Sequence, residues 1–315
     1  MKIAVMGSGG VGGYFGGRLA HAGCDVAFIA RGAHLAALRE RGLEIRSALG
    51  DIALPRVRAS DDPRTLGPVD LVLFSVKLWD SETAARALAP LLGPHTGIVS
   101  LQNGVQKDDL LRRVCGEPAV MGGVAYIGAR IAHPGVIEHT GTLQRLVFGE
   151  YDGLRSARAE ALLEACRRAG IDAELSGDIR REIWEKFVFL VGLSATTATM
   201  RVPIGRVRGH PQARAFLFEV MQEVVAVGRA HGVALAEDYA ATRLAFCDDL
   251  PADMTSSMYH DLERGNPLEL AWLSGGVVEL GAAFGVPTPT NRAVRDILAL
   301  HARGRAEQVH GVDGA

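Results

Sequence analysis

Short apolar runs alternate with helical patterns over the first half of the chain. Unbroken apolar runs over Lys2–Met6, Asp25–Ala30 and Asp70–Val76 predict buried strands, because a strand covered on both faces needs few polar positions. Further strands are expected over Gly97–Leu101 and Ala119–Val124. Helical spacing between these runs predicts helices over Tyr14–Ala22, His34–Arg41 and Ser81–Leu92. This alternation is typical of a parallel sheet with helices on its faces.

Two parts of this half predict antiparallel pairing instead. Leu43–Ser47 and Asp51–Leu54 are joined through Gly50 and predict a short hairpin. Val136–His139 and Arg145–Phe148 are further strands whose connections are too short for a helical crossover. The parallel sheet therefore has a further sheet region appended to it.

The pattern changes to a helical period from Leu154 onward. A last strand is expected over Ile171–Leu175, and helices over Arg155–Ala169, Ile179–Thr199, Pro211–His231, Glu237–Asp248, Pro267–Phe284 and Thr290–Ala302. The change places a domain boundary near Ser176–Asp178. We expect an α/β, doubly wound domain over residues 1–176 and a mostly α-helical domain over residues 177–315.

Composition and charge exclude several classes of protein. The chain has 315 residues, 48% of them hydrophobic, and a formal net charge of −2, so no basic excess points to nucleic acid or to an anionic membrane surface. The apolar runs are too short to cross a bilayer, and the amino end lacks the features of a signal peptide. The sequence contains no HExxH motif or similar cluster of metal ligands, so no metal site is expected. Free thiols in the cytoplasm are the expected state of the widely spaced Cys24, Cys115, Cys166 and Cys247.

A glycine-rich segment lies between the first strand and the first helix and matches G-x-G-x-x-G. In this context Gly7 permits a tight turn, Gly9 lets the backbone approach a pyrophosphate, and Gly12 allows close packing of helix on strand. The alternative is a glycine-rich turn without a ligand. We expect a Rossmann-type domain whose cofactor is held by Gly7, Ser8, Gly9, Gly10, Val11 and Gly12.

The end of the second strand distinguishes NAD from NADP. A carboxylate usually stands there to bind the ribose 2′-hydroxyl of NAD. This strand ends in Arg31, which can pair with a 2′-phosphate and stack on the adenine. A solvated surface arginine is the alternative. The sequence therefore favours NADPH/NADP⁺.

Polar residues follow two other strands, at the edge where ligands bind in open α/β sheets. Lys77 follows the Asp70–Val76 run, and Asn103 follows the Gly97–Leu101 run. Taken singly, these are also what a surface lysine and an Asn-Gly turn look like. In the helical half, the same holds for Lys186, Ser257 and Glu269, which alone would be a surface lysine, part of a helix cap and a solvated acid.

The chain resembles the ketopantoate reductases (2-dehydropantoate 2-reductases) over nearly its whole length. The resemblance lies in the GSGGVG segment, Arg31, and the segments SVKLWD with Lys77, LQNG with Asn103, REIWEKF with Lys186, TSSM with Ser257, and the segment of Glu269. It implies a Rossmann domain joined to a helical domain, with the active site in the cleft between them. It also implies NADPH-dependent reduction of a branched, hydroxylated 2-oxo acid on the route to pantothenate.

The resemblance implies a role for each matching residue. Lys186 would be the general acid, because hydride transfer to a ketone builds negative charge on an oxygen that needs a proton donor. Asn103 would touch cofactor and substrate, Ser257 would bind substrate, and Glu269 would hold the cofactor and help to order the lysine. Two further cofactor contacts are expected from the Lys77 side chain and the Gly128 backbone.

The chain departs from the family where the substrate binds. The family carries asparagines one and two helical turns after the lysine, and here those substrate-binding positions are Leu190 and Ser194. A third family asparagine aligns with Ile204. Loss of an amide removes a donor and an acceptor, so a more apolar 2-oxo acid or ketone is an alternative substrate.

Two further functions are compatible with a dinucleotide-binding domain followed by a helical one. The first is a hydroxyacid or glycerol-phosphate dehydrogenase of similar build, and the second is a non-catalytic NADP-binding sensor. We expect a homodimer, although the apolar helices over Phe216–Val227 and Leu268–Leu280 could equally pack within their own domain.

Overall fold

The computed structural model describes residues 1–305, which form two compact units. The first consists of Met1–Asn103 and Lys107–Glu182, and the second of Gly104–Gln106 and the chain from Ile183 onward. Within residues 1–305, no helix combines the length and apolar character needed to span a bilayer.

The first unit is built on one sheet of ten strands. Its order is β4-β3-β9-β8-β7-β6-β1-β2-β5, with β10 paired to β9. The strands are β1 Lys2–Met6, β2 Asp25–Ile29, β3 Leu43–Ser47, β4 Ile52–Leu54, β5 Arg58–Ser60, β6 Leu71–Phe74, β7 Gly97–Ser100, β8 Val120–His133, β9 Val136–Gly149 and β10 Asp172–Leu175. The part β5-β2-β1-β6-β7-β8 is parallel throughout. This is the Rossmann order, with its topological switch point between β1 and β6.

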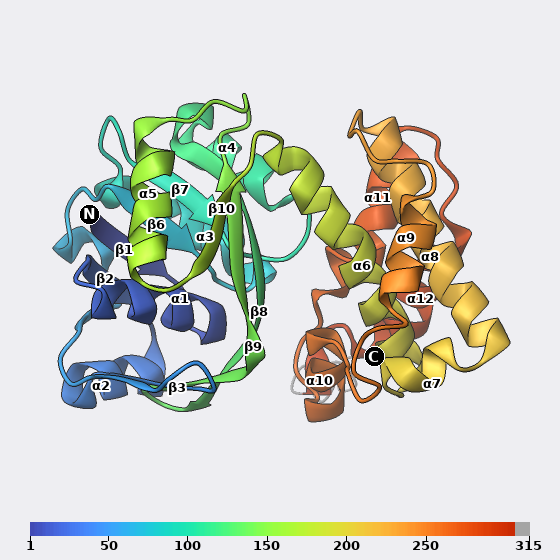
Figure 1. The fold of residues 1–315 in the computed structure, drawn as a ribbon, viewed down its shortest axis with the longest axis horizontal. Helices are drawn as coiled ribbons and strands as arrows, with labels where there is room; N and C mark the ends of the chain where they lie inside the picture. The colour runs from blue at the N-terminus through green and yellow to red at the C-terminus, as the bar shows by residue number, and fades with distance from the viewer. Residues whose placement is uncertain (306–315) are drawn as a thin grey trace, which may run out of the picture. The chain divides into compact units, whose positions relative to one another are not determined.

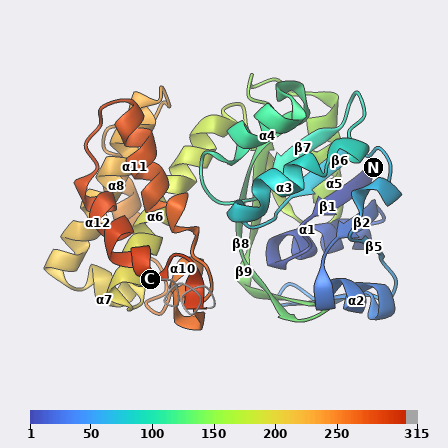
Figure 2. The same cartoon turned by 180° about the vertical axis from the view of Figure 1, so that it is seen from behind.

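Helices cover both faces of this sheet, as the continuous apolar strands predict. Alternate residues of β1 point to opposite sides: Ile3 and Val5 join one core, and Ala4 and Met6 join another. Helices α1 and α5 lie over one face in Figure 1, and α3 and α4 lie over the other in Figure 2. The helices of this unit are α1 Gly10–His21, α2 Gly32–Arg41, α3 Ser81–Arg86, α4 Lys107–Cys115 and α5 Ala157–Arg168.

Helix α1 packs against the sheet through glycines. A Cβ atom at Gly16 would lie 2.6 Å from Val5 Cγ2, and one at Gly17 would lie 2.6 Å from Ile45 Cδ1. The absence of side chains lets the helix axis approach the strands more closely than an alanine face would allow. The buried Tyr14, Phe15 and Leu19 of the same helix complete this core.

The second unit is helical. Its elements are α6 Ile179–Met200, α7 Ile204–Arg208, α8 Pro211–Ala230, α9 Tyr239–Phe246, α10 Ser257–Arg264, α11 Ser274–Ala283 and α12 Pro289–Leu298. The first residues of α6, up to Glu182, belong to the first unit. A separate apolar core includes Phe187 of α6, Leu217 and Met221 of α8, and Val277 of α11. This unit therefore buries its own hydrophobic face independently of the sheet.

Several predicted elements differ from the structure. The helix expected over Pro267–Phe284 is interrupted: a 3₁₀ turn covers Glu269–Ala271, and α11 begins only at Ser274. The helix expected over Ser81–Leu92 ends at Arg86, and a separate 3₁₀ turn over Ala89–Leu91 contains Pro90, which cannot donate a helical hydrogen bond. Elements that the pattern did not predict are α4, α7, α10 and β5.

The antiparallel prediction holds only in part. Val136–His139 and Arg145–Phe148 are one strand, β9, and it pairs antiparallel with β8 as expected. The same strand also pairs in parallel with β3 and with β10. The hairpin of β3 and β4 forms as predicted.

The four cysteines are free thiols with different accessibility. Cys166 and Cys247 are buried, and burial raises the pKa of Cys166 to about 12 and that of Cys247 to about 11. At pH 8 their thiolate fractions are on the order of 10⁻⁴ and 10⁻³, and the thiolate is the nucleophile.

We therefore predict that Ellman's reagent at pH 8 labels neither Cys166 nor Cys247 in the native protein. Cys24 and Cys115, which are half-buried, should react slowly, and all four thiols should react in denaturant. Rapid labelling of four thiols under native conditions would contradict the burial of Cys166 and Cys247.

Candidate active site

The glycine loop is fastened between the ends of two neighbouring strands. The backbone N–H groups of Gly7 and Ser8 donate to the Ile29 carbonyl at 3.2 and 3.1 Å, at the end of β2. On the other side, the Ser75 hydroxyl after β6 donates to the Gly7 carbonyl at 3.1 Å. Gly7 has φ +93°, and a Cβ atom there would lie 2.7 Å from the Val76 nitrogen. Only glycine satisfies both the conformation and the space at this turn.

The glycines that follow differ in what surrounds them. A Cβ atom at Gly12 would overlap the Gly7 carbonyl and the Ser75 hydroxyl, and one at Gly10 would overlap the Ala129 carbonyl of β8. Gly9, in contrast, has no atom within 4 Å of its Cβ position. The loop is thus packed on protein at Gly10 and Gly12 and opens to space at Gly9, at the amino end of α1. Such an end favours a negatively charged group.

Gly128 lies beside this loop. It precedes Ala129, which contacts Gly10, and the β8–β9 register shifts between Ile127 and Gly128. The structure therefore brings the predicted Gly128 next to the glycine segment.

Arg31 lies two residues after the end of β2 and is the N-cap residue of α2. Its side chain is 77% exposed and donates from Nη2 to Asp80 Oδ2 at 2.7 Å. Asp80 lies in the turn after β6 and is the last residue of the SVKLWD segment. The resemblance implied no role for it. A carboxylate 49 residues away in the chain gives no local signal that it meets Arg31.

Hydrogen bonds of Gln102 join the two segments that carry Lys77 and Asn103. Gln102 donates from Nε2 to the Val76 carbonyl at 2.8 Å and to the Ser81 hydroxyl at 2.7 Å. It thereby joins the chain just before Asn103 to the chain on both sides of Lys77. Lys77 is exposed, with Nζ 5.4 Å from the centroid of the Trp79 ring, and Asn103 is half-buried.

A buried ion pair at the start of α4 ties that helix to β7 and β8. Lys107 Nζ donates to the Ser100 carbonyl of β7 at 3.0 Å, to the Gly123 carbonyl of β8 at 3.1 Å and to Asp108. Tyr151 donates to Asp108 Oδ2 at 2.6 Å. Burial lowers the pKa of Lys107, and the contact with Asp108 opposes that shift. No sequence pattern indicated this arrangement, because charged residues at the start of a helix usually remain solvated.

In the second unit, α6 arranges the predicted residues at four-residue intervals. Lys186, Leu190 and Ser194 therefore lie along one face of the helix. Lys186 and Leu190 are half-buried. Ser194 is fully buried, and its hydroxyl has no hydrogen-bond partner among residues 1–305.

The remaining predicted residues lie on α10 and on the turn before α11. Ser256, rather than Ser257, caps α10: its hydroxyl accepts from the Tyr259 N–H at 3.0 Å and lies 2.9 Å from the Thr197 hydroxyl of α6. Ser257 is the exposed first residue of the helix. Glu269 is buried, at 8% exposure, so the interpretation of this residue as a solvated acid is wrong.

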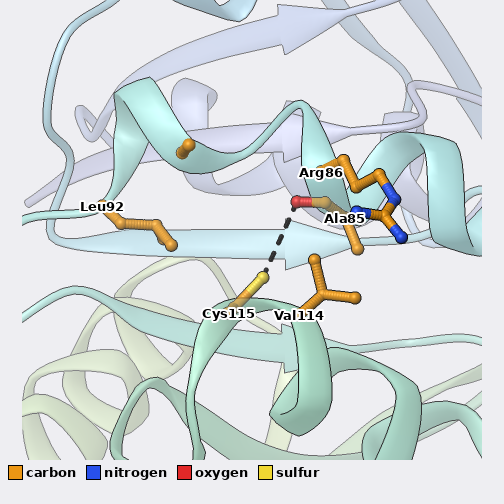
Figure 3. A pocket seen from close by; sticks show the side chains of 6 residues that line it. Ala85, Arg86, Leu92, Val114 and Cys115 are labelled. Atoms are coloured by element: carbon orange, nitrogen blue, oxygen red, sulfur yellow. Dashed lines mark hydrogen bonds between the residues drawn. The ribbon is translucent and has the colours of Figure 1, made fainter.

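One pocket lies away from these residues. It has a volume of about 290 Å³ between α3 and α4 and is shown in Figure 3. Cys115 and Val114 face Ala85 and Arg86 across it, and Ala89 and Leu92 complete its lining. It contains none of the predicted site residues. In the part of the chain that the structure describes, no group of three or more His, Cys, Asp or Glu side chains could hold a metal ion.

Comparison with known proteins identifies the family. Residues 3–153 match the family described as Ketopantoate reductase PanE/ApbA, and residues 178–302 match Ketopantoate reductase PanE/ApbA C terminal. The chain belongs to this family. It is accordingly an oxidoreductase of the ketopantoate reductase family, as the sequence resemblance implied.

Individual relatives agree with this assignment. A 2-dehydropantoate 2-reductase of Archaeoglobus fulgidus is 34% identical over 299 residues, covering 94% of this chain and 96% of the relative. The crystal structure of a PanE/ApbA family ketopantoate reductase from Ralstonia eutropha JMP134 has a TM-score of 0.88 and 35% identity, covering 98% of this chain and 100% of that chain. A D-mandelate dehydrogenase, solved with NADH and anilino(oxo)acetate, shares the fold at a TM-score of 0.86 with 19% identity, over 96% of this chain and 98% of that chain.

The open space at Gly9 gives a direct test of cofactor binding. We predict that Gly9→Ala folds with a free energy of unfolding within about 1 kcal/mol of wild type, because its Cβ meets no protein atom. It should nevertheless weaken dinucleotide binding at least tenfold, measured by quenching of protein fluorescence, because the methyl group would occupy the approach of the phosphates.

Gly23→Ala provides a control with equal open space away from the loop, although its φ of +89° makes it somewhat destabilising. Unchanged dinucleotide affinity in Gly9→Ala would mean that the phosphates do not bind at this turn.

Proposed function

We propose that this chain reduces 2-dehydropantoate to pantoate with NADPH, in the cytoplasm, as a step of pantothenate biosynthesis. The observation that carries the proposal is the retention of Lys186, half-buried on α6, in a chain that matches the family over both of its parts. The free thiols agree with a reducing compartment.

The first unit fits a dinucleotide. The glycine loop leaves space at Gly9 beside the amino end of α1, and Arg31 and Lys77 supply positive charge at the neighbouring strand ends. In the proposal the loop backbone binds the diphosphate, Arg31 binds the 2′-phosphate, and Gly128 makes a backbone contact. NADPH, when bound, would supply the hydride for C2 of the 2-oxo acid.

The chain's own residues supply the proton and position the substrate. As hydride reaches the carbon, the carbonyl π-bond electrons move to the oxygen, and the Lys186 ammonium donates its proton to that oxygen. The products are a hydroxyl group at C2, NADP⁺ and neutral Lys186, which regains a proton from water. In the proposal, Asn103 and Ser257 hold the substrate and Glu269 helps to order Lys186.

A more apolar 2-oxo acid or ketone is the second candidate substrate. Leu190 occupies a half-buried position on the same face of α6 as Lys186. A leucine offers no hydrogen bond to a substrate hydroxyl, and a buried unpaired hydroxyl costs about 1–3 kcal/mol, or roughly ten- to hundredfold in affinity.

The choice of substrate follows from steady-state kinetics. We expect NADPH oxidation at 340 nm to show the highest kcat/KM with 2-dehydropantoate in a panel that includes less polar 2-oxo acids and ketones. A preference for an apolar member would replace the proposed substrate with the second candidate. No turnover with any member would leave a dinucleotide-binding protein without this catalytic activity.

The role of Lys186 is tested by Lys186→Ala. We predict a loss of kcat of about 10²- to 10⁴-fold, because general acid catalysis is removed, with little change in the Kd for NADPH. If Lys186→Ala retained the wild-type kcat, Lys186 would not be the proton donor.

Restoration of the family amide tests the role of position 190. We compare kcat/KM for 2-dehydropantoate with kcat/KM for a substrate that lacks the hydroxyl. We predict that Leu190→Asn raises the ratio of the two roughly ten- to hundredfold, mainly by lowering the KM for 2-dehydropantoate. Leu190→Met is the matched apolar control and should leave that ratio unchanged. Equal ratios in both variants would show that position 190 does not contact the hydroxyl group.

A further inference from the structure

A carboxylate pairs with the arginine at the end of β2, although the sequence just after that strand contains none. Asp80 comes from the turn after β6, and its Oδ2 accepts a hydrogen bond from Arg31 Nη2 at 2.7 Å. In dinucleotide-binding domains, a carboxylate at this place binds the ribose 2′-hydroxyl of NAD, and an arginine accommodates the 2′-phosphate of NADP. This chain brings both groups to one place.

The pair is open to solvent and therefore able to exchange partners. The Arg31 side chain is 77% exposed and that of Asp80 is 33% exposed. Exposed ion pairs of this kind are weak, because water screens the charges and the side chains lose freedom. Asp80 is the only hydrogen-bond partner of the Arg31 side chain within residues 1–305, so the Nε and Nη1 donors remain available to a ligand.

We propose that Asp80 allows this site to accept NADH as well as NADPH and that it sets the ratio of the two affinities. For NADH, the carboxylate offers an acceptor to the 2′-hydroxyl. For NADPH, it cancels the charge of Arg31 and repels a 2′-phosphate that carries a charge of about −1.5 to −2 at pH 7. The inference rests on the dinucleotide site of the proposed function and widens its cofactor range.

Asp80→Asn removes this charge with almost no change in shape. We expect the variant to bind NADPH roughly three- to tenfold more tightly and NADH more weakly by a similar factor, since one charge acts at short range in a partly solvated site. Arg31→Ala should have the opposite effect on NADPH and spare NADH. Binding is measured by fluorescence titration, and circular dichroism establishes that each variant is folded.

Glu82→Gln is the matched control. Glu82 lies two residues further on, at the start of α3, and pairs with Arg86 at 2.7 Å rather than with Arg31. The substitution removes one negative charge close to Asp80 in the sequence. The control should change neither affinity by more than about twofold, since surface charges act weakly beyond direct contact.

Two fragments separate this inference from the proposed function. Adenosine 2′,5′-bisphosphate and AMP carry the relevant ribose but neither nicotinamide nor hydride, so calorimetry with them reports the subsite without turnover. Asp80→Asn should bind the bisphosphate more tightly and AMP more weakly.

If Asp80→Asn weakens the bisphosphate instead, Asp80 holds Arg31 in place for the phosphate, and the inference is wrong. Unchanged affinities for both fragments also overturn it. If folded wild-type protein binds neither fragment nor either dinucleotide, both the inference and the proposed function fail. Binding with the expected response to Asp80→Asn, but without reduction of any 2-oxo acid, supports the inference and removes only the proposed reaction.

Discussion

The turn at Gly7 leaves no space for a side chain, and the arrangement of the first unit depends on that close approach. Its backbone is hydrogen-bonded to the end of β2, receives the Ser75 hydroxyl from the end of β6, and lies against Val76. Three strand ends are thereby brought to one point at the topological switch of the sheet. Arg31, Lys77 and Asp80 share a neighbourhood because these strand ends do.

Elements whose pattern is dictated by burial alone could be predicted from the sequence. β1, β2 and β6 are covered on both faces, so their apolar runs are unbroken and their positions were found to within one or two residues. Helix α4 was not found, because Lys107 and Asp108 look solvated until Tyr151, 43 residues after Asp108, supplies the partner that permits their burial. The break before α11 was missed because an apolar run does not show where a 3₁₀ turn ends.

The same distinction applies to the site. The glycine loop is a local motif, and its geometry followed from its spacing. The carboxylate beside Arg31 depends on a contact between two loops far apart in the sequence, and no local pattern could reveal it. The cofactor preference expected from the β2 end considered one strand, whereas in the structure the arginine at that end pairs with Asp80 of the loop after β6. In the second unit, Leu190 and the buried Ser194 stand where the resemblance implies asparagines, so the difference falls at positions expected to bind substrate rather than at Lys186.

The glycine content of α1 has a consequence for the order of folding. Five of its twelve residues are glycine, at positions 10, 12, 13, 16 and 17. Relative to alanine these lower the intrinsic stability of the helix by roughly 4–5 kcal/mol, so the isolated segment does not form a helix in water. Its helical form therefore depends on β1, β2 and β3, which offer the surface against which the glycines pack. We expect α1, with the glycine turn at its start, to form together with the sheet rather than ahead of it.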